Sequence, residues 1–370
     1  MARITIILQD LGGGGAEKMM VRLANQLAEG EDRVSLILLM AGGENLQYVN
    51  AKVDVFELGA SRSIAALAGL RRRLRALQPD AVLSVLTHVN VISIVACASL
   101  GWLAKLSVSE RNTYSLDRQV NPQWMVRCAY VLAPWLYRLL PKPVIAVSKG
   151  VASDLVLSAG IGAHQVTTAP NPVIHHQWQL QSRVASQHPW LQQKQGKVIV
   201  AMGRLVEQKG FDFLVDAFAR LNQQMLCRLI IFGEGPLREA LTAQAAKLAV
   251  SERIDFAGYC PNPLAEIRLA DLFVLSSRFE GSPNALVEAM ALGTPVVAFD
   301  CPHGPREILD DGQLAPLVEM GDVGGLCQAM LASLQLPLSD SGRQRLIQSV
   351  QRYRACQAAA HYRQLLLGVS

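Results

Sequence analysis

The sequence predicts an α/β protein made of two doubly wound parallel-sheet domains. Short apolar strand patterns alternate with helix patterns, first over residues 1–170 and again over residues 197–340. Such alternation is typical of parallel sheets with helices on both faces. The length of 370 residues also suits two domains of roughly 150 residues each. Between them, residues 171–196 are polar and glutamine-rich, which indicates a linker, and residues 341–370 predict terminal helices that pack back toward the first domain.

The composition excludes several classes of protein. Hydrophobic residues make up 51% and charged residues 18%, so the chain is globular and not disordered. Its seven cysteines are scattered and form no C-x-x-C pair, which argues against a disulfide framework and against a structural zinc. The first residues lack the basic start and long apolar core of a signal peptide. We therefore expect a cytoplasmic enzyme or binding protein.

One uncharged stretch, residues 81–104, is long enough to cross a bilayer. Polar residues interrupt it at positions 87–90. We therefore predict a buried strand over 81–86, a polar loop, and a buried helix over 91–100, in place of a membrane span.

The net charge of +5 lies entirely in the first domain, where residues 1–170 carry 17 Lys and Arg against 12 Asp and Glu. This half is therefore expected to meet an anionic substrate or surface. No nucleic-acid motif accompanies the charge, so nucleic acid is not an expected partner. Aromatic and basic residues on a mostly apolar segment, 123–140, predict a membrane-surface face; the alternative is a core helix with solvated arginines. Those residues, with one arginine just upstream, are Arg118, Trp124, Arg127, Trp135, Tyr137 and Arg138.

Two carboxylates of the second domain, Glu280 and Glu288, form a candidate ligand site. The apolar run Leu272–Leu275 predicts a strand, so Glu280 follows a strand and Glu288 lies in the next helix. Both carboxylates then face one crevice, where they could accept hydrogen bonds from sugar hydroxyls. The alternative is that Glu280 is a solvated loop acid and Glu288 part of the charged face of the helix.

The start of that helix predicts an anion site. Ser282 suits the N-cap and Pro283 the first helical position. The first-turn amides of Asn284, Ala285 and Leu286, at the positive end of the helix dipole, could then hold a phosphate.

A glycine-rich loop, Gly12–Gly15, joins the predicted strand Arg3–Leu8 to the predicted helix Ala16–Leu27. Glycines let a backbone approach a ligand closely, and the helix start can hold an anion. The loop is not a dinucleotide fingerprint, because Glu17 occupies the third glycine position, and the chain has no Gly-Lys-Ser/Thr of a Walker loop. A tight turn with nothing bound is the alternative.

Other polar residues follow strands of the first domain, whose carboxyl ends meet at one edge of the sheet. His88 follows a buried strand and is a candidate general base, with a structural histidine as the alternative. Glu110, Arg111 and Asn112 follow the next strand, and we expect them to face an acceptor.

Two cations follow the first strand of the second domain, in the loop Gly203–Gly210. Arg204 can neutralise a diphosphate through forked hydrogen bonds, and Lys209 can do so as a point charge. Such cations are the more needed because the chain contains no Asp-x-Asp triplet to hold a metal.

Together these motifs resemble the retaining glycosyltransferases of family 4, which have the GT-B fold, with two Rossmann-like domains facing a central cleft. The resemblance covers nearly the whole chain. Its motifs are Gly-Gly-Ala-Glu at 14–17, Pro-Asn-Pro at 170–172, Gly-Arg-Leu-Val-Glu-Gln-Lys-Gly at 203–210, Phe-Gly-Glu-Gly-Pro at 232–236, the pair Glu280 and Glu288, and Gly-Thr-Pro-Val-Val-Ala at 293–298.

The resemblance implies that the first domain binds the acceptor and the second the nucleotide sugar. Arg204 and Lys209 would hold the donor diphosphate, Glu288 the ribose and Glu280 the donor sugar. The remaining implied ligand-binding residues are Gly14 and Gly15 on the acceptor side, and Gly233, Ser282, Asn284, Ala285 and Leu286 on the donor side.

The implied reaction is the retaining, metal-independent transfer of a hexose or N-acetylhexosamine from a nucleotide sugar, with UDP as the expected nucleotide. The acceptor would be lipid-linked or a polysaccharide, in bacterial cell-surface glycan synthesis. Residues 109–112 and 299–308 resemble the branch that extends polyprenyl-diphosphate-linked oligosaccharides. Pro305 departs from many relatives, because it lacks an amide N–H that could contact the donor sugar.

The expected partners are thus the donor, the acceptor and an anionic membrane surface touched by the first domain at the inner face of the cytoplasmic membrane. No cofactor is expected. Two alternatives stay open, a GT-B-fold sugar-nucleotide epimerase and a non-catalytic sugar-nucleotide-binding protein. Product analysis with the donor alone would separate an epimerase from a transferase.

Overall fold

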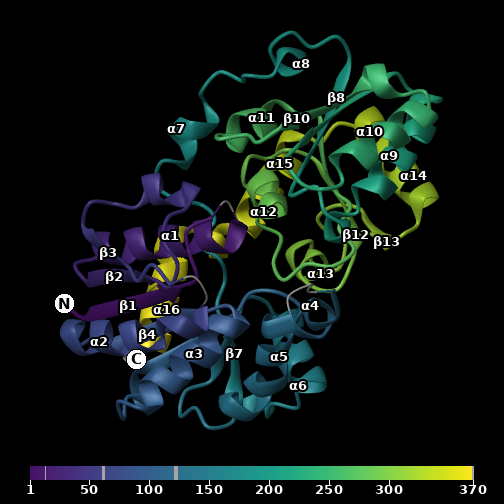
Figure 1. The fold of residues 1–370 in the computed structure, drawn as a ribbon. Coiled ribbons are helices and arrows are strands. Elements are labelled where there is room, and N and C mark those ends of the chain that lie inside the picture. The colour runs from purple at the N-terminus through teal and green to yellow at the C-terminus, as the bar shows by residue number, and fades with distance from the viewer. Residues whose placement is uncertain (13, 61–62, 121–123, 369–370) are drawn as a thin grey trace. The chain divides into compact units, whose positions relative to one another are not determined.

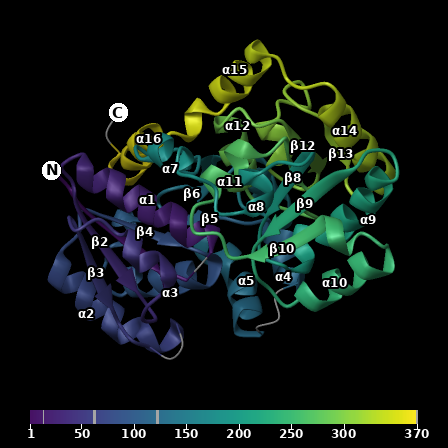
Figure 2. The same cartoon turned by 90° about the horizontal axis from the view of Figure 1, so that it is seen from above.

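The computed structural model describes residues 1–12, 14–60, 63–120 and 124–368. The chain divides into two compact units, one formed by Met1–His175 with Tyr353–Ser370 and the other by His176–Arg352 (Figure 1). Each unit is an α/β layer structure with helices on both faces of one sheet (Figure 2).

Within the described residues, seven parallel strands form the sheet of the first unit. In sheet order they are β3 (Val53–Glu57), β2 (Arg33–Leu38), β1 (Arg3–Leu8), β4 (Ala81–Val85), β5 (Leu106–Glu110), β6 (Val144–Ala146) and β7 (Val166–Thr168). The central strands β1 and β4 are mostly apolar and almost entirely buried because both faces of the sheet are covered. The helices are α1 (Gly15–Glu29), α2 (Leu67–Leu77), α3 (Thr87–Ala98), α4 (Tyr114–Val120), α5 (Trp124–Tyr137), α6 (Lys149–Ser158) and α16 (Ala355–Leu367).

The described part of the second unit holds a six-stranded parallel sheet. In sheet order its strands are β10 (Ile254–Gly258), β9 (Cys227–Phe232), β8 (Lys197–Met202), β11 (Leu272–Leu275), β12 (Val296–Asp300) and β13 (Leu317–Glu319). Its helices are α7 (Trp178–Ser182), α8 (Pro189–Gln192), α9 (Phe211–Asn222), α10 (Arg238–Lys247), α11 (Pro263–Leu269), α12 (Asn284–Ala291), α13 (Pro305–Ile308), α14 (Val323–Gln335) and α15 (Asp340–Ser349).

The unit boundaries differ from the predicted domain boundaries at both ends of the second unit. The polar segment 171–196 contains α7 and α8, and Ser186 in this segment donates a hydrogen bond to Glu266 of α11. The C-terminal segment is split between the units. Helix α15 packs on α12 in the second unit, whereas α16 packs on α1 in the first.

The uncharged stretch 81–104 forms β4 and α3. Across the described ranges, no helix combines the length and the apolar character needed to span a bilayer. The predicted polar loop at 87–90 is wrong, because these residues form the first turn of α3. Its polar side chains are held inside the unit: Thr87 donates to the Glu110 carboxylate at 2.8 Å, and Asn90 donates to the same carboxylate at 3.2 Å.

Both sheets have a point where the strand order reverses. In the first unit the chain runs outward from β1 to β3 and then returns to β4 beside β1; in the second it runs from β8 to β10 and returns to β11 beside β8. Loops at the carboxyl ends of strands diverge at such switch points, and open α/β sheets bind their ligands there. The fold therefore places one candidate site at the β1/β4 switch point and one at the β8/β11 switch point.

Candidate functional site

At the β8/β11 switch point an ion pair joins two loops. Lys209 Nζ lies 2.5 Å from Glu280 Oε1. The same carboxylate oxygen accepts a hydrogen bond from Ser277 Oγ at 2.6 Å. Glu280 is only 6% exposed. A buried carboxylate with two short donors is fixed in orientation, so this side chain is pre-positioned for a ligand.

The two loops are held together along their backbones. Ser276 Oγ donates to the Lys209 carbonyl at 3.0 Å, and the Arg278 amide donates to the Gln208 carbonyl at 2.7 Å. Gly210 has φ of +60°, and a Cβ at this position would lie 2.1 Å from the Ser276 carbonyl oxygen. Only glycine therefore permits this approach. The two serines that follow β11, Ser276 and Ser277, were missed in the sequence, although polar residues directly after an apolar strand are a usable signal.

A third loop, after β9, packs against the Arg204 loop. Gly233 has φ of +137°, and a Cβ there would lie 1.9 Å from the Gly203 carbonyl oxygen. The Leu205 amide donates to the Glu234 carbonyl at 2.8 Å, which ties the two loops together. Arg204 itself is exposed and forms no ion pair with a carboxylate in the described ranges. Its guanidinium donors thus remain available to an anion.

Helix α12 carries the second glutamate. Glu288 is 6% exposed, so neither carboxylate of the pair is a solvated surface acid. The predicted cap was displaced by one residue: Pro283 is the N-cap, with φ of −70° and ψ of 98°, and the helix begins at Asn284. The Leu286 amide donates to the Pro283 carbonyl at 3.2 Å, which corrects the prediction that this amide stays unpaired. Ser282 lies one residue too early to cap the helix.

The loop after β12 also lies at the carboxyl-end edge of the second sheet. The Glu280 amide donates to the Pro302 carbonyl at 2.7 Å. Gly304 has φ of +94°, and a Cβ there would lie 2.6 Å from Pro283 Cδ, so this loop also packs against the start of α12. Pro305 is the first residue of α13, a position where a helix does not need the missing N–H.

The β1/β4 switch point of the first unit holds His88. Its Nε2 contacts Gln9 Oε1, while Gln9 Nε2 donates to Asp10 at 3.2 Å. This amide orientation places the hydrogen of His88 on Nε2 and leaves Nδ1 as an acceptor. Burial lowers the pKa of His88 to about 4, so the ring is neutral at pH 7. The loop after β1 carries Gly14, which is the N-cap of α1 and has no side chain to cap the helix.

Glu110 and Arg111 do not face an acceptor, which corrects the prediction. Glu110 ends β5, is 3% exposed and accepts hydrogen bonds from Tyr137, Thr87 and Asn90. Burial raises its pKa to about 7. Arg111 is buried as well and donates to the Tyr362 hydroxyl at 2.7 Å and to the Asn171 side chain.

These two side chains therefore connect α5 and α16 to the sheet. Neither Tyr137 nor Tyr362 was recognised as a partner from the sequence, because they lie 27 and 251 residues from the side chains that they contact. Asn112 donates to Asp117 at 3.1 Å. In the part of the chain that the structure describes, no group of three or more His, Cys, Asp or Glu side chains could hold a metal ion.

Comparison with protein families covers both units. Residues 13–177 match the model described as Glycosyltransferase Family 4, and residues 196–335 match the model described as Glycosyl transferases group 1. The chain belongs to the glycosyltransferases of family 4.

Solved structures confirm the GT-B fold of this family 4 glycosyltransferase. HepE from Anabaena was solved in complex with UDP and glucose. It aligns over 100% of this chain and 100% of its own chain, with a TM-score of 0.77 at 20% identity. WaaG, a glycosyltransferase involved in lipopolysaccharide biosynthesis, covers 99% of this chain and 100% of its own with a TM-score of 0.74 at 14% identity. At these identities the likeness concerns the fold alone.

Curated relatives of this family 4 glycosyltransferase include one of nearly equal length. The N-acetylgalactosamine-N,N'-diacetylbacillosaminyl-diphospho-undecaprenol 4-alpha-N-acetylgalactosaminyltransferase of Campylobacter jejuni is 26% identical over 348 residues, 90% of this chain and 91% of that protein. The lipopolysaccharide core biosynthesis glycosyltransferase LpsE of Rhizobium meliloti is 36% identical over 155 residues, 40% of this chain. The glycosyltransferase MJ1059 of Methanocaldococcus jannaschii is 39% identical over 117 residues, 31% of this chain. The chain spans only 44% of LpsE and 29% of MJ1059.

Proposed function

We propose that this family 4 glycosyltransferase moves a hexose or N-acetylhexosamine from a nucleoside diphosphate sugar, with UDP as the nucleotide, to a lipid-linked or polysaccharide acceptor of the bacterial cell surface. The observation that carries the proposal is the Lys209–Glu280 contact beside the exposed Arg204 at the β8/β11 switch point. Transfer from such a donor needs cations for the leaving diphosphate and acceptors for sugar hydroxyls. This one cluster of loops supplies both.

In the proposed donor complex, Arg204 binds the diphosphate through its guanidinium fork and Lys209 adds a point charge. Glu280 accepts hydrogen bonds from the donor sugar, and Glu288 accepts them from the ribose. The donor phosphates also lie near Ser282 and the first turn of α12, formed by Asn284, Ala285 and Leu286. The Leu286 amide already donates to a carbonyl within the helix. Gly233 matters because a side chain there would push the Arg204 loop away.

The proposed reaction retains the anomeric configuration. The bond between the anomeric carbon and the diphosphate oxygen breaks, and the acceptor hydroxyl attacks from the same face of an oxocarbenium-like sugar. The hydroxyl proton passes to the leaving diphosphate, whose charge Arg204 and Lys209 stabilise. No step requires a bound metal, because these two side chains supply the positive charge.

In the first unit we assign the acceptor side to Gly14, Gly15 and His88. A neutral His88 whose Nε2 hydrogen points to Gln9 offers Nδ1 as a hydrogen-bond acceptor. It can thus accept a hydrogen bond from an acceptor hydroxyl and orient it while the ring stays neutral, and the hydroxyl proton passes to the leaving diphosphate.

We further propose that α5 contacts an anionic membrane surface at the inner face of the cytoplasmic membrane. Val131, Leu132, Trp135 and Leu139 are 52–69% exposed and follow one stripe of the helix and its end. The Arg138 guanidinium lies 5.2 Å from the Trp135 ring centre, so a cation accompanies the apolar stripe. Exposed apolar and basic side chains on one helix suit the interface of an anionic bilayer. Residue 123 and the Trp124 side chain, part of the predicted face, lie outside the described residues.

The relatives support the lipid-linked acceptor. The Campylobacter jejuni protein, which aligns over 90% of this chain, is by its name a transferase acting on a diphospho-undecaprenol-linked sugar. The Rhizobium meliloti protein is by its name a transferase of lipopolysaccharide core biosynthesis. Neither relative favours the epimerase or the non-catalytic alternative.

A donor screen tests the proposal. Nucleoside diphosphate release is measured for UDP-, GDP- and ADP-sugars, with and without a bacterial membrane-lipid extract as acceptor. We expect release from a UDP-hexose or UDP-N-acetylhexosamine that depends on the extract, with the sugar recovered in the lipid fraction in retained configuration. Conversion of the donor without an acceptor would favour an epimerase, and binding without turnover would favour a non-catalytic protein.

A further inference from the structure

A second group of cations lies at the opposite edge of the sheet in the second unit. Lys197 begins β8, Asp271 immediately precedes β11, and Pro295 immediately precedes β12. These residues therefore lie at the amino ends of parallel strands, whereas Lys209 and Glu280 lie beyond the carboxyl ends. Strand β8 has six residues, and a strand rises about 3.3 Å per residue, so roughly 20 Å separate the two edges.

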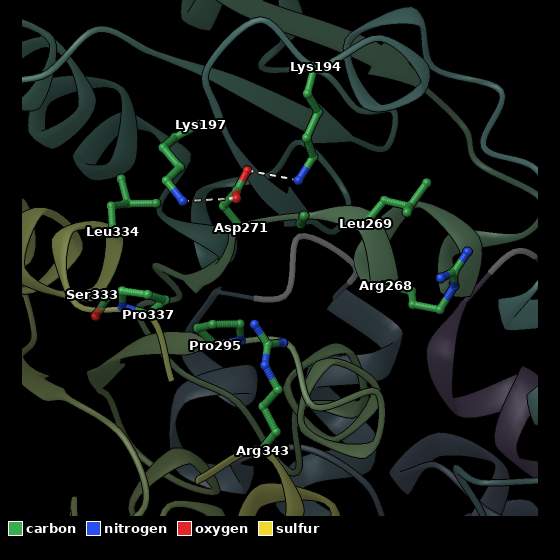
Figure 3. Close-up of a pocket in the computed structure, with 11 residues that line it drawn as sticks. Lys194, Lys197, Arg268, Leu269, Asp271, Pro295, Ser333, Leu334, Pro337 and Arg343 are labelled. Atoms are coloured by element: carbon green, nitrogen blue, oxygen red, sulfur yellow. Dashed lines mark hydrogen bonds and ion pairs between the residues drawn. The ribbon is translucent and has the colours of Figure 1, made fainter. Parts of the chain in front are cut away.

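This edge contains a pocket of about 280 Å³ with a strongly positive lining. Its charged lining residues come from distant parts of the chain and are Lys194, Lys197, Arg268, Asp271 and Arg343. The lining thus contains four cations and a single carboxylate. Figure 3 shows both lysines pointing toward Asp271, with the Arg343 guanidinium beside Pro295 and the Arg268 side chain extending away from Asp271.

Asp271 is already fully engaged. Lys194 Nζ lies 2.9 Å and Lys197 Nζ 3.4 Å from its carboxylate oxygens, and the Val198 amide donates to it at 2.9 Å. One negative charge shared by two ammonium groups leaves an excess of positive charge at the strand ends.

The two arginines add charge that no described acid balances. Arg343 Nη1 donates to the Gly293 carbonyl at 3.0 Å, and Arg268 Nε donates to the Ser182 carbonyl at 2.6 Å. Carbonyl oxygens orient a guanidinium without neutralising it. In residues 176–352, all of which the structure describes, neither arginine pairs with a carboxylate. Each therefore keeps N–H donors and a full charge for a ligand.

We propose that this pocket binds the phosphate group of a small phosphorylated molecule, at a site separate from the donor site. Lysine ammonium and arginine guanidinium groups are the side chains that recognise phosphate. The volume lies at the lower end of the roughly 300–1,000 Å³ typical of ligand pockets, which suits a small phosphate ester better than a whole nucleotide sugar.

The proposal is tested by calorimetric titration of inorganic phosphate into the full-length protein previously saturated with UDP. UDP occupies the donor site, so phosphate binding then reports on the second pocket. We expect binding of one phosphate per chain. Lys197→Met should weaken it about tenfold, because one charge-assisted contact is lost. The control Lys247→Met, an exposed lysine at the end of α10, should leave it unchanged.

A second variant separates charge from folding. Asp271→Asn keeps an oxygen for the Val198 amide but removes the competing negative charge, so phosphate should bind more tightly than to the wild type. If Asp271 and Lys197 only stabilised the fold, Asp271→Asn and Lys197→Met would change phosphate binding in the same direction. Absence of phosphate binding to the wild type, or such parallel changes, would overturn the proposal. Failure of UDP to bind would instead count against the proposed function. The phosphate titration would then be carried out in the absence of UDP and would still test the second pocket.

Discussion

Lys209 Nζ and Glu280 Oε1 lie 2.5 Å apart although 71 residues separate them in the chain. Their contact bridges the loops after β8 and β11, which are adjacent strands at the switch point of the sheet. The lysine is held in place before any donor arrives, so little side-chain entropy is lost when a diphosphate binds. Removing either partner would leave the other charge partly buried and unbalanced.

Arg204→Gln should reduce kcat/KM for sugar transfer about 100-fold, because one preorganised donor to the developing diphosphate charge is lost. Arg204 is exposed, so the melting temperature should not change. Steady-state kinetics and a thermal melt measure the two effects. Arg345→Gln, an exposed arginine on α15, is the matched control and should behave as wild type. Equal kinetics for the two variants would show that Arg204 does not bind the donor.

Gly233→Ala should lower the free energy of unfolding of the second unit by about 2–4 kcal/mol, because the new methyl group meets the Gly203 carbonyl and φ is positive. Gly312→Ala is the control: φ is also positive, at +86°, but the nearest atom lies 3.5 Å away. It should cost only about 1 kcal/mol. Denaturant unfolding followed by circular dichroism measures both. Similar losses for the two variants would show that loop contact at Gly233 is not the cause.

The strands at the switch points were predicted well because their apolar residues stand out between polar and glycine-rich segments. The predicted bounds of Arg3–Leu8 and Leu272–Leu275 agree with β1 and β11. Helix α11 and strand β13 were missed, since the former is seven residues long and begins at a proline and the latter has only three residues. The polar start of α3 looked like a loop because its partners lie on other elements.

The candidate site was predicted in part. Arg204, Lys209 and the two glutamates could be named because they follow predicted strands or start a predicted helix. Their pairing could not be predicted, because the contact between Lys209 and Glu280 depends on the order of strands in the sheet. The burial of Glu110 was also missed, since its partner Tyr137 lies on α5.

Glu110 should make the first unit less stable as the pH rises. Its pKa is about 4.5 in an unfolded chain and about 7 in the folded protein. Between these values the unfolded chain releases a proton that the folded protein keeps, so the free energy of unfolding falls with rising pH. The whole difference corresponds to roughly 3 kcal/mol. Stability from this group is complete below pH 4.5 and lost above pH 7.

Glu110→Gln should remove that pH dependence. Melting temperatures of the wild type and the variant, measured between pH 5 and pH 8, check the expectation. The wild type should lose stability relative to the variant across this range. Parallel curves would mean that Glu110 stays ionised inside the unit.

Trp135→Ser should weaken binding to vesicles that contain phosphatidylglycerol by roughly tenfold, because an exposed aromatic ring would no longer enter the interface. Vesicle flotation measures the bound fraction. Leu226→Ser is the control, since Leu226 is 67% exposed but belongs to the second unit. If both substitutions had the same effect, or if the wild type did not float, α5 would not be the membrane-contacting face.

The most direct test of the account is the affinity of UDP for the wild type and for Lys209→Ala, measured by isothermal titration calorimetry. Lys247→Ala serves as the control for loss of an exposed lysine. We predict that UDP binds the wild type and the control equally, that Lys209→Ala weakens the affinity about tenfold or more, and that sugar transfer is lost in the same variant. An unchanged UDP affinity and turnover in Lys209→Ala would contradict the account.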